Sequence, residues 1–151
     1  MDKIKELIQK GAQVSNPGSV TIGDEVDVGR IAGNGVTVFP GTRISGARTF
    51  IAQGARIGAQ APVTIENCYI GPDVALDGGY FNGAVFLRKA RCGSGSHVRQ
   101  GTILEEESSI AHTVGLKQTI LFPFVTLGSL INFCDCLMAG GSSRQNHSEV
   151  G

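Results

Sequence analysis

The chain has 151 residues, with 13 lysines and arginines against 13 aspartates and glutamates, so its formal net charge is zero. This balance gives no support for binding to nucleic acid or to an anionic membrane surface, and the longest apolar runs are too short to cross a bilayer. Glycine is abundant, at 22 residues, whereas aromatic residues make up only 6% of the chain. Such a composition suits a stack of short repeats better than a globular core.

A short helix is predicted over residues 2–10. Ile4, Leu7 and Ile8 lie at helical spacing, and Gly11 follows as a stop signal. With an apolar stripe on one face and lysines on the other, the helix is expected to pack across the open end of a repeat stack, where it would protect the first strand edges. Residues 1–12 are therefore assigned to an N-terminal helix and residues 13–151 to a separate repeat domain.

A six-residue repeat follows the helix. Branched aliphatic residues recur at about this interval from residue 22 to residue 76, including Ile22 and Val28, and residues 77–84 (DGGYFNGA) interrupt the pattern as a predicted loop. The repeat is most regular over residues 92–116, where Cys92, Val98, Leu104, Ile110 and Leu116 lie six positions apart. A period of six fits neither a half-buried strand nor a helix. It indicates a repeat architecture in which each unit buries its apolar side chain against the next unit.

The predicted fold is an all-β, hexapeptide-repeat parallel β-helix. Three short sides would close one coil of about 18 residues, with the repeated apolar residues pointing inward and the coils stacked about 4.8 Å apart. The last segment, residues 139–151, is polar and has no repeat. An open last coil would expose unpaired strand edges, so we expect either that the chain is truncated at its C-terminal end or that another subunit covers this end.

Several segments resemble the C-terminal domain of bacterial sugar-1-phosphate nucleotidylyltransferases, including bifunctional UDP-N-acetylglucosamine pyrophosphorylase/glucosamine-1-phosphate acetyltransferase. Residues 10–23 resemble the step that joins the nucleotidyl domain to the repeat in that family. VRQG at 98–101 resembles its L-R-P-G, VGLKQT at 114–119 its V-E-x-K-x-x, and residues 128–141 its last steps. The resemblance implies a left-handed β-helix and a homotrimer, which the flat sides of such a coil would also suit.

The resemblance assigns a phosphate clamp to Arg99 and Lys117. The family uses this basic pair to hold the phosphates of a sugar nucleotide, and a guanidinium with an ammonium suits that contact. The two residues lie 18 positions apart, so they should sit on the same side of adjacent coils. The alternative interpretation is two solvated charges. Asn132 takes the place of a family tyrosine and is a further candidate for substrate binding.

The family's general base is not conserved in this chain, because Ser129 occupies the position of its histidine. His112 is a candidate replacement, since imidazole titrates near neutral pH, although a structural or interface role is the favoured interpretation. His147 lies in the polar terminal segment beside Asn146, and the two are candidates for catalysis and substrate binding, respectively. The nucleotidyl domain is absent, so uridylyl transfer is not expected.

The sequence predicts no metal site. Cys134 and Cys136 have one residue between them, too few for paired zinc ligands, and on a strand both thiols would share one face, with Asp135 on the other. Both are expected to be buried apolar thiols. A metal-dependent hydratase is disfavoured, because His97 and His112 lie 15 positions apart and so do not match an 18-residue coil.

Two functions remain open after these observations. In the first, the chain is the β-helix domain of a sugar-nucleotide transferase, and it binds a nucleotide sugar or sugar phosphate at a trimer cleft. Acetyl-CoA would then be the candidate cofactor for acyl transfer. In the second, the chain is a trimerisation or regulatory scaffold without transferase activity. The lack of a secretion signal and of a disulfide framework leads us to expect a cytoplasmic protein.

Overall fold

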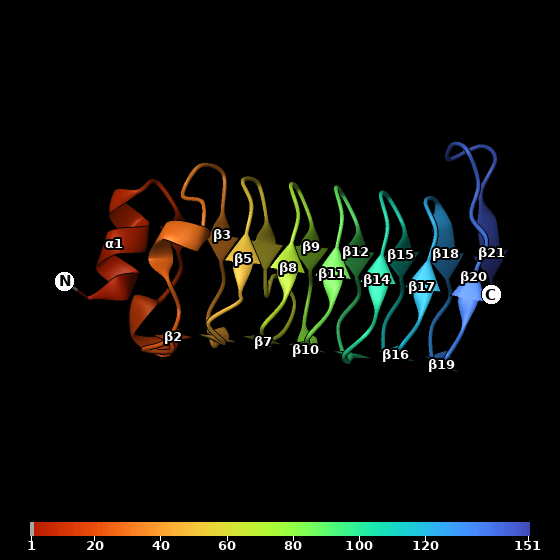
Figure 1. Ribbon diagram of the computed structural model, residues 1–151. Coiled ribbons are helices and arrows are strands. Elements are labelled where there is room, and N and C mark those ends of the chain that lie inside the picture. Colours follow the sequence, from red (N-terminus) through yellow and green to blue (C-terminus); the bar gives the residue numbers. More distant parts are fainter. Residues whose placement is uncertain (1) are drawn as a thin grey trace.

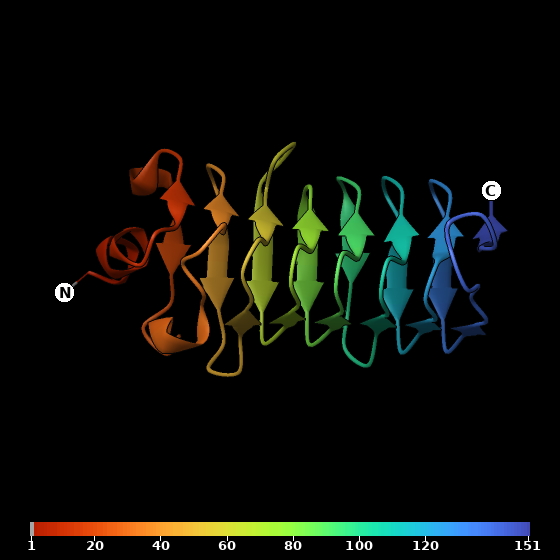
Figure 2. The same cartoon turned by 90° about the horizontal axis from the view of Figure 1, so that it is seen from above.

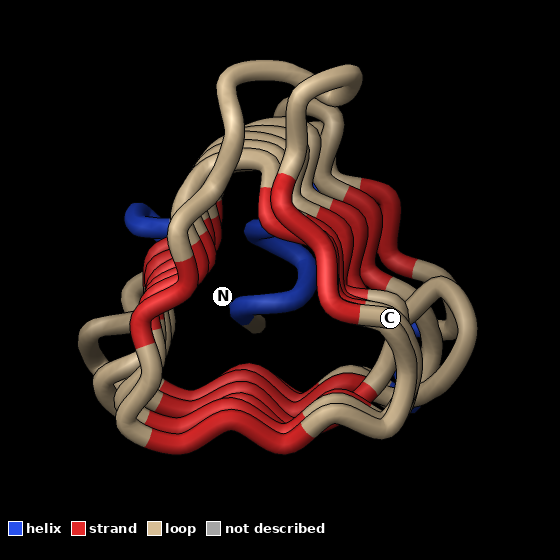
Figure 3. Tube along the Cα trace, turned by 90° about the vertical axis from the view of Figure 1, so that its right-hand side faces the viewer, coloured by secondary structure: helices blue, strands red, loops and turns tan. Residues whose placement is uncertain are grey.

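The chain forms a parallel β-helix with one short helix at its N-terminal end (Figure 1). The structure is a computed structural model and describes residues 2–151. The coils stack side by side along one axis (Figure 2), and the view along that axis shows a triangle with strands on its three sides and loops at its corners (Figure 3). Each side is one parallel sheet. We call them sheets A, B and C, with eight, seven and six strands.

The bounds of the strands follow the three sheets. Sheet A contains β1 (Gln13–Val14), β3 (Thr37–Val38), β6 (Arg56–Ile57), β9 (Ala75–Leu76), β12 (Arg91–Cys92), β15 (Ser109–Ile110), β18 (Val125–Leu127) and β21 (Ser148–Val150). Sheet B contains β2 (Thr21–Ile22), β4 (Arg43–Ser45), β7 (Val63–Glu66), β10 (Gly79–Asn82), β13 (Ser96–Val98), β16 (Gly115–Lys117) and β19 (Asn132–Cys134). Sheet C contains β5 (Phe50–Ile51), β8 (Tyr69–Ile70), β11 (Val85–Phe86), β14 (Ile103–Leu104), β17 (Ile120–Leu121) and β20 (Leu137–Met138). The helical segments are α1 (Lys3–Gln9) and the 3₁₀ turns η1 (Pro17–Ser19) and η2 (Val28–Arg30).

The six-residue repeat of the sequence corresponds to the three sides of one coil. Cys92 pairs with Ile110 in sheet A, and Val98 pairs with Leu116 in sheet B. Leu104 lies between them on sheet C. Each of these five residues is no more than 3% exposed, so the predicted inward stacking of the regular segment is confirmed.

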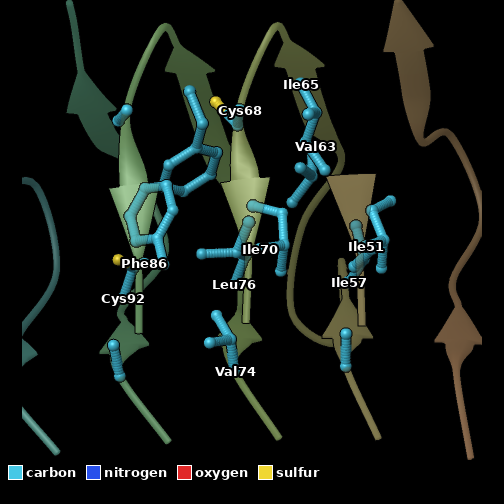
Figure 4. Close-up of a cluster of buried hydrophobic side chains, with 14 of the residues drawn as sticks. Ile51, Ile57, Val63, Ile65, Cys68, Ile70, Val74, Leu76, Phe86 and Cys92 are labelled. Carbon is cyan, nitrogen blue, oxygen red and sulfur yellow. The ribbon is translucent and has the colours of Figure 1, made fainter. Parts of the chain in front are cut away.

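Two phenylalanines lie inside the middle coils of the stack. Phe81 and Phe86 are fully buried and make an edge-to-face contact with their ring centroids 5.6 Å apart. Ile70, Leu76 and Cys92 stack in the same interior (Figure 4). This column of inward side chains is the hydrophobic core of the domain.

Two local predictions were wrong. Residues 77–84 are not a loop, because Gly79–Asn82 form β10, which pairs with β7 and β13. The inward residue of this strand is Phe81, which pairs with Ile65 and Val98. Because it is aromatic, the spacing of aliphatic residues did not indicate a strand here. Val28 does not lie in a strand but in η2, and Ile31 instead makes the sheet C bridge to Ile51.

Helix α1 closes the N-terminal end of the stack, as the sequence predicted. Asp2 accepts a hydrogen bond from the backbone N–H of Ile4 at 2.8 Å and so caps the helix, and Leu7 is buried against the first coil. The lysines were expected to face away from the stack. Instead, the ammonium of Lys3 donates to the carbonyl of Val26 at 2.7 Å, and Lys10 donates to the carbonyl of Val28 at 2.8 Å. The N-terminal helical segment therefore supplies hydrogen-bond donors to backbone carbonyl groups of the first coil.

The last coil carries a protruding loop. Residues 139–147 connect β20 to β21 and rise at the corner between sheets C and A (Figures 1 and 3). Phe133 and Met138 remain partly buried against the core, whereas Leu137 is 64% exposed. Within residues 2–151, no helix has the length and apolar character needed to cross a membrane.

A matched pair of threonines gives a test of polar burial in the core. Thr102 is 1% exposed, and its Oγ1 has no hydrogen-bond partner within residues 2–151. Thr119 occupies the same position one coil later and donates from Oγ1 to the carbonyl of Lys117 at 3.0 Å. Thr102→Val is expected to stabilise the protein by about 1 kcal/mol, because it removes an unpaired buried hydroxyl at constant volume. Thr119→Val is expected to destabilise the protein, because it removes the hydrogen bond to the carbonyl of Lys117. Urea denaturation of the two variants would measure both changes in stability. Destabilisation by Thr102→Val as large as that by Thr119→Val would contradict this account.

Candidate functional site

The outer face of sheet B presents two rows of side chains, because alternate residues of each strand point outward. The first row contains Arg43, Thr64, Tyr80, His97, Gly115 and Asn132. The second row includes Ser45, Glu66, Asn82, Lys117 and Cys134. Arg99 directly follows β13 and lies between Asn82 and Lys117 in this second row.

Arg99 and Lys117 lie side by side, as their spacing predicted. Val98 pairs with Leu116, and the backbone N–H of Arg99 donates to the carbonyl of Leu116 at 2.9 Å. The two cationic side chains therefore start from neighbouring coils, about 4.8 Å apart. Neither forms an ion pair with any residue from 2 to 151. Their charges are available to a ligand, although their role in binding stays a prediction.

Gly115 lies beside these two cations, between His97 and Asn132 in the first row. The side chain of Asn132 leans over it, so that a Cβ atom at Gly115 would lie only 2.9 Å from Oδ1 of Asn132. On the other side of Gly115, the rings of Tyr80 and His97 are stacked with centroids 4.9 Å apart. Asn82 donates from Nδ2 to the Tyr80 hydroxyl at 3.0 Å and steadies that ring.

This arrangement places an aromatic platform, an amide and two cations on one face. A ring that carries a phosphate could rest on the platform while Arg99 and Lys117 contact its phosphate oxygens. Tyr80 and Gly115 were not recognised from the sequence. The sequence contains one indication of this row: Tyr80, His97, Gly115 and Asn132 are separated by 17 or 18 positions. This spacing identifies neighbours only when the length of each coil is known.

His112 lies at another corner of the triangle, between sheets A and B. It is exposed, and its Nδ1 is 3.2 Å from the hydroxyl oxygen of Thr113. The backbone N–H of Leu130 donates to the carbonyl of His112 at 3.2 Å. His112 is therefore one coil away from Ser129, the position where the resembled family has its histidine.

His147 and Asn146 lie on the loop between sheets C and A, away from Arg99 and Lys117. Nδ1 of His147 is 3.1 Å from the carbonyl oxygen of Arg144, and its Nε2 is 2.8 Å from a carboxylate oxygen of Glu149. Both ring nitrogens thus face oxygen acceptors, and neither is free to take a proton from a substrate in this arrangement. Asn146 donates from Nδ2 to the hydroxyl of Ser142 at 2.7 Å.

The predicted site residues consequently fall into three places. Arg99, Lys117 and Asn132 share the outer face of sheet B. His112 lies at the corner between sheets A and B, and His147 lies with Asn146 at the corner between sheets C and A. The first group shares one sheet face, whereas His147 of the last group borders a hollow of about 220 Å³.

The cysteine pair is arranged differently from the prediction. Cys134 is exposed and Cys136 is partly exposed, because Asp135 adopts a left-handed conformation (φ 57°) and turns the chain between β19 and β20. The two thiols therefore do not share one buried face. Among residues 2–151, no three His, Cys, Asp or Glu side chains are close enough together to hold a metal ion.

The four thiols should differ sharply in reactivity. Burial raises the pKa of Cys68 to about 11 and raises the pKa of Cys92 well above its usual value. Because the thiolate is the reactive form and both side chains are also shielded from solvent, neither should react at pH 8 in the folded protein. Titration with dithionitrobenzoate is expected to modify Cys134 and Cys136 quickly and the other two only in denaturant. Rapid modification of all four in the native state would contradict the buried positions.

Comparison with known proteins supports the resemblance found in the sequence. The chain is 30% identical to the bifunctional protein GlmU of Thermotoga petrophila over 122 residues, which cover 80% of this chain and 26% of that protein. It is 26% identical to the bifunctional protein GlmU of Cutibacterium acnes over 136 residues, covering 90% and 31%, respectively. No protein-family model matches the chain. These matches and the parallel β-helix confirm a resemblance to the repeat domain of such proteins, and the chain spans about a quarter to a third of their length.

Proposed function

We propose that this chain is the β-helix domain of a sugar-nucleotide transferase, and that it binds a nucleotide sugar or sugar phosphate on the outer face of sheet B. The observation that carries this proposal is the pair Arg99 and Lys117 on adjacent coils, beside Gly115 and the side chain of Asn132. Within residues 2–151 neither cation forms an ion pair with a carboxylate, and such a cation pair suits phosphate oxygens. The sugar or base would lie against the platform of Tyr80 and His97, and Asn132 would donate to its hydroxyl or carbonyl groups.

The ligand-binding test is thermal unfolding and titration calorimetry with UDP-N-acetylglucosamine. A ligand at about 100 times its dissociation constant stabilises a protein by roughly 2.7 kcal/mol. Arg99→Ala and Lys117→Ala are each expected to weaken binding by about tenfold or more, because each removes a charge-assisted contact. Arg43→Ala, at the distant end of the same sheet, is the matched control and should bind normally. Equal affinity in all three variants would exclude the clamp.

Acyl transfer is the chemistry that the resemblance suggests for this domain. In this proposal His112 acts as the general base in place of Ser129, and acetyl-CoA supplies the acyl group. His147 acts only if its contacts to Arg144 and Glu149 are released. The measurement is acetyl transfer from acetyl-CoA to glucosamine-1-phosphate, with His112→Asn as the test variant. Turnover that persists unchanged in His112→Asn would exclude this assignment.

The second candidate function is a scaffold that assembles three copies of the chain. Its support is the outer face of sheet C, where one apolar side chain follows another on all six strands. These residues are Phe50, Tyr69, Val85, Ile103, Ile120 and Leu137. Tyr69 is 40% exposed and Leu137 is 64% exposed. A continuous exposed apolar row typically marks a protein–protein interface, and flat sheet faces suit a closed symmetric assembly.

The scaffold proposal is tested by sedimentation. Wild-type protein is expected to sediment as a trimer of the 15.8 kDa chain. Ile103→Glu should dissociate it, because the change places an unpaired charge in the apolar face. Thr64→Glu, on sheet B, is the matched control. A trimer that binds no nucleotide sugar and transfers no acetyl group would favour the scaffold over the transferase.

A further inference from the structure

A second hollow surface lies on the outer face of sheet A, on a different side of the triangle from Arg99 and Lys117. The outward residues of five consecutive strands are Arg56, Ala75, Arg91, Ser109 and Thr126. Ala75 pairs with Arg56 on one side and with Arg91 on the other. Because strands are about 4.8 Å apart, the two arginines leave the sheet about 10 Å apart, with only a methyl group between them.

Small residues widen this gap into a groove. The hollow around Ala75 has a volume of about 530 Å³ and is bordered by both arginines. A neighbouring hollow of about 290 Å³ continues along the sheet over Gly93, Ser109 and Ala111. Arg91 rises between the two hollows and borders both, and the floor on either side of it is made of small residues, so the groove is open to a small molecule.

Arg144 forms the far wall of the groove. This residue is carried by the loop 139–147, borders both hollows and also borders a third one of about 220 Å³ beside His147. Nη2 of Arg144 is 3.0 Å from a carboxylate oxygen of Glu107, which holds the loop over the sheet. The loop thereby brings a third guanidinium toward the two on the strands.

The charge of the largest hollow is predominantly positive. Arg56, Arg91, Arg144 and Lys89 border it, against the two carboxylates of Asp73 and Asp77. Within residues 2–151, only Arg144 of these four cations forms an ion pair. Arg56 lies over the ring of Phe39, with 5.3 Å from its Cζ to the ring centroid, a contact that limits the positions its guanidinium can occupy.

We propose that this groove binds a phosphate-bearing small molecule, of which a diphosphate is the simplest form. Arg56 and Arg91 contact its phosphate oxygens from the two sides of Ala75, since a guanidinium offers a fork of donors that matches such oxygens. Lys89 and Arg144 add positive charge at the rim. Asp77 lies one residue beyond the strand that carries Ala75 and accepts a hydrogen bond from a hydroxyl of the ligand.

The experiment is isothermal titration calorimetry of the full chain with inorganic pyrophosphate. It uses the Arg99→Ala/Lys117→Ala double variant as the background, so that binding on sheet B does not contribute. Saturable binding is expected, weakened about tenfold or more by Arg56→Ala and by Arg91→Ala. Arg43→Ala is the control, because it removes an exposed arginine of sheet B without touching the groove. Circular dichroism confirms that each variant is folded.

Two further variants test whether pyrophosphate binding depends on the shape of the groove or only on its positive charge. Ala75→Leu fills the space between the arginines without changing any charge, and it should abolish binding. Asp77→Asn removes a negative charge from the rim, and it should tighten pyrophosphate binding severalfold. Absence of saturable binding, equal losses in Arg43→Ala and Arg91→Ala, or normal binding in Ala75→Leu would each overturn the proposal. Loss of UDP-sugar binding in Arg99→Ala leaves this result unaffected, so the two sites can fail independently.

Discussion

Phe81→Ala is expected to lower the free energy of unfolding by about 3–5 kcal/mol, the usual cost of deleting a buried aromatic ring. Phe81 is fully buried in the middle of the stack and makes an edge-to-face contact with Phe86. The coils above and below are fixed by their own backbone hydrogen bonds, so they cannot move in to fill the cavity. Urea denaturation followed by circular dichroism would measure the loss.

The matched control is Phe39→Ala. Phe39 is only partly buried on the outside of sheet A, where it contacts the guanidinium of Arg56. We expect a loss of about 1 kcal/mol there, mostly from the cation–π contact. Similar losses in the two variants would mean that the interior of the middle coils is not the main source of stability.

Gly79→Ala is expected to disrupt the middle of sheet B. Gly79 opens β10 with φ 127°, a conformation that residues with a side chain rarely adopt, and a Cβ atom there would collide with the backbone of Ser96 in the next coil. Neither the strain nor the collision can be relieved by moving a flexible side chain. A loss of about 2–4 kcal/mol is expected from strain and displacement of the backbone.

Gly18→Ala provides the comparison for this prediction. A Cβ atom at Gly18 would have no heavy atom within 4 Å, so the change should alter stability by less than about 0.5 kcal/mol. Hydrogen exchange should show faster opening of β7, β10 and β13 in Gly79→Ala and no change in Gly18→Ala. An equally small effect at both positions would show that β10 tolerates a side chain at its start.

The fold was predictable from the sequence because its core repeats at a fixed interval. Over residues 92–116 every coil side has six residues, and the five repeated side chains are all buried. The prediction was wrong where the coil length changes. Leu76 pairs with Cys92 after 16 residues, so the interval shortens at residues 77–84, and Phe81 was not recognised as a core residue.

The candidate sites were predictable only where the register was regular. Arg99 and Lys117 could be placed side by side because their coil has 18 residues. Arg56 and Arg91 could not, because two coils of different lengths separate them. The role of Lys3 and Lys10 was missed for another reason. A lysine on a helix surface is usually solvated, and only the three-dimensional structure shows which carbonyl groups of the first coil lie within its reach.

The regular pairing between coils also determines how such a chain can change in length over evolution. Insertion of one residue inside a strand would turn every following side chain of that strand to the opposite face. Duplication or loss of a whole coil, for instance the 18 residues from Cys92 to the position before Ile110, leaves every remaining pair of strands in register. A complete coil can therefore be gained or lost without a change of register, although loss of residues 92–109 would also remove Arg99 from the cation pair on sheet B.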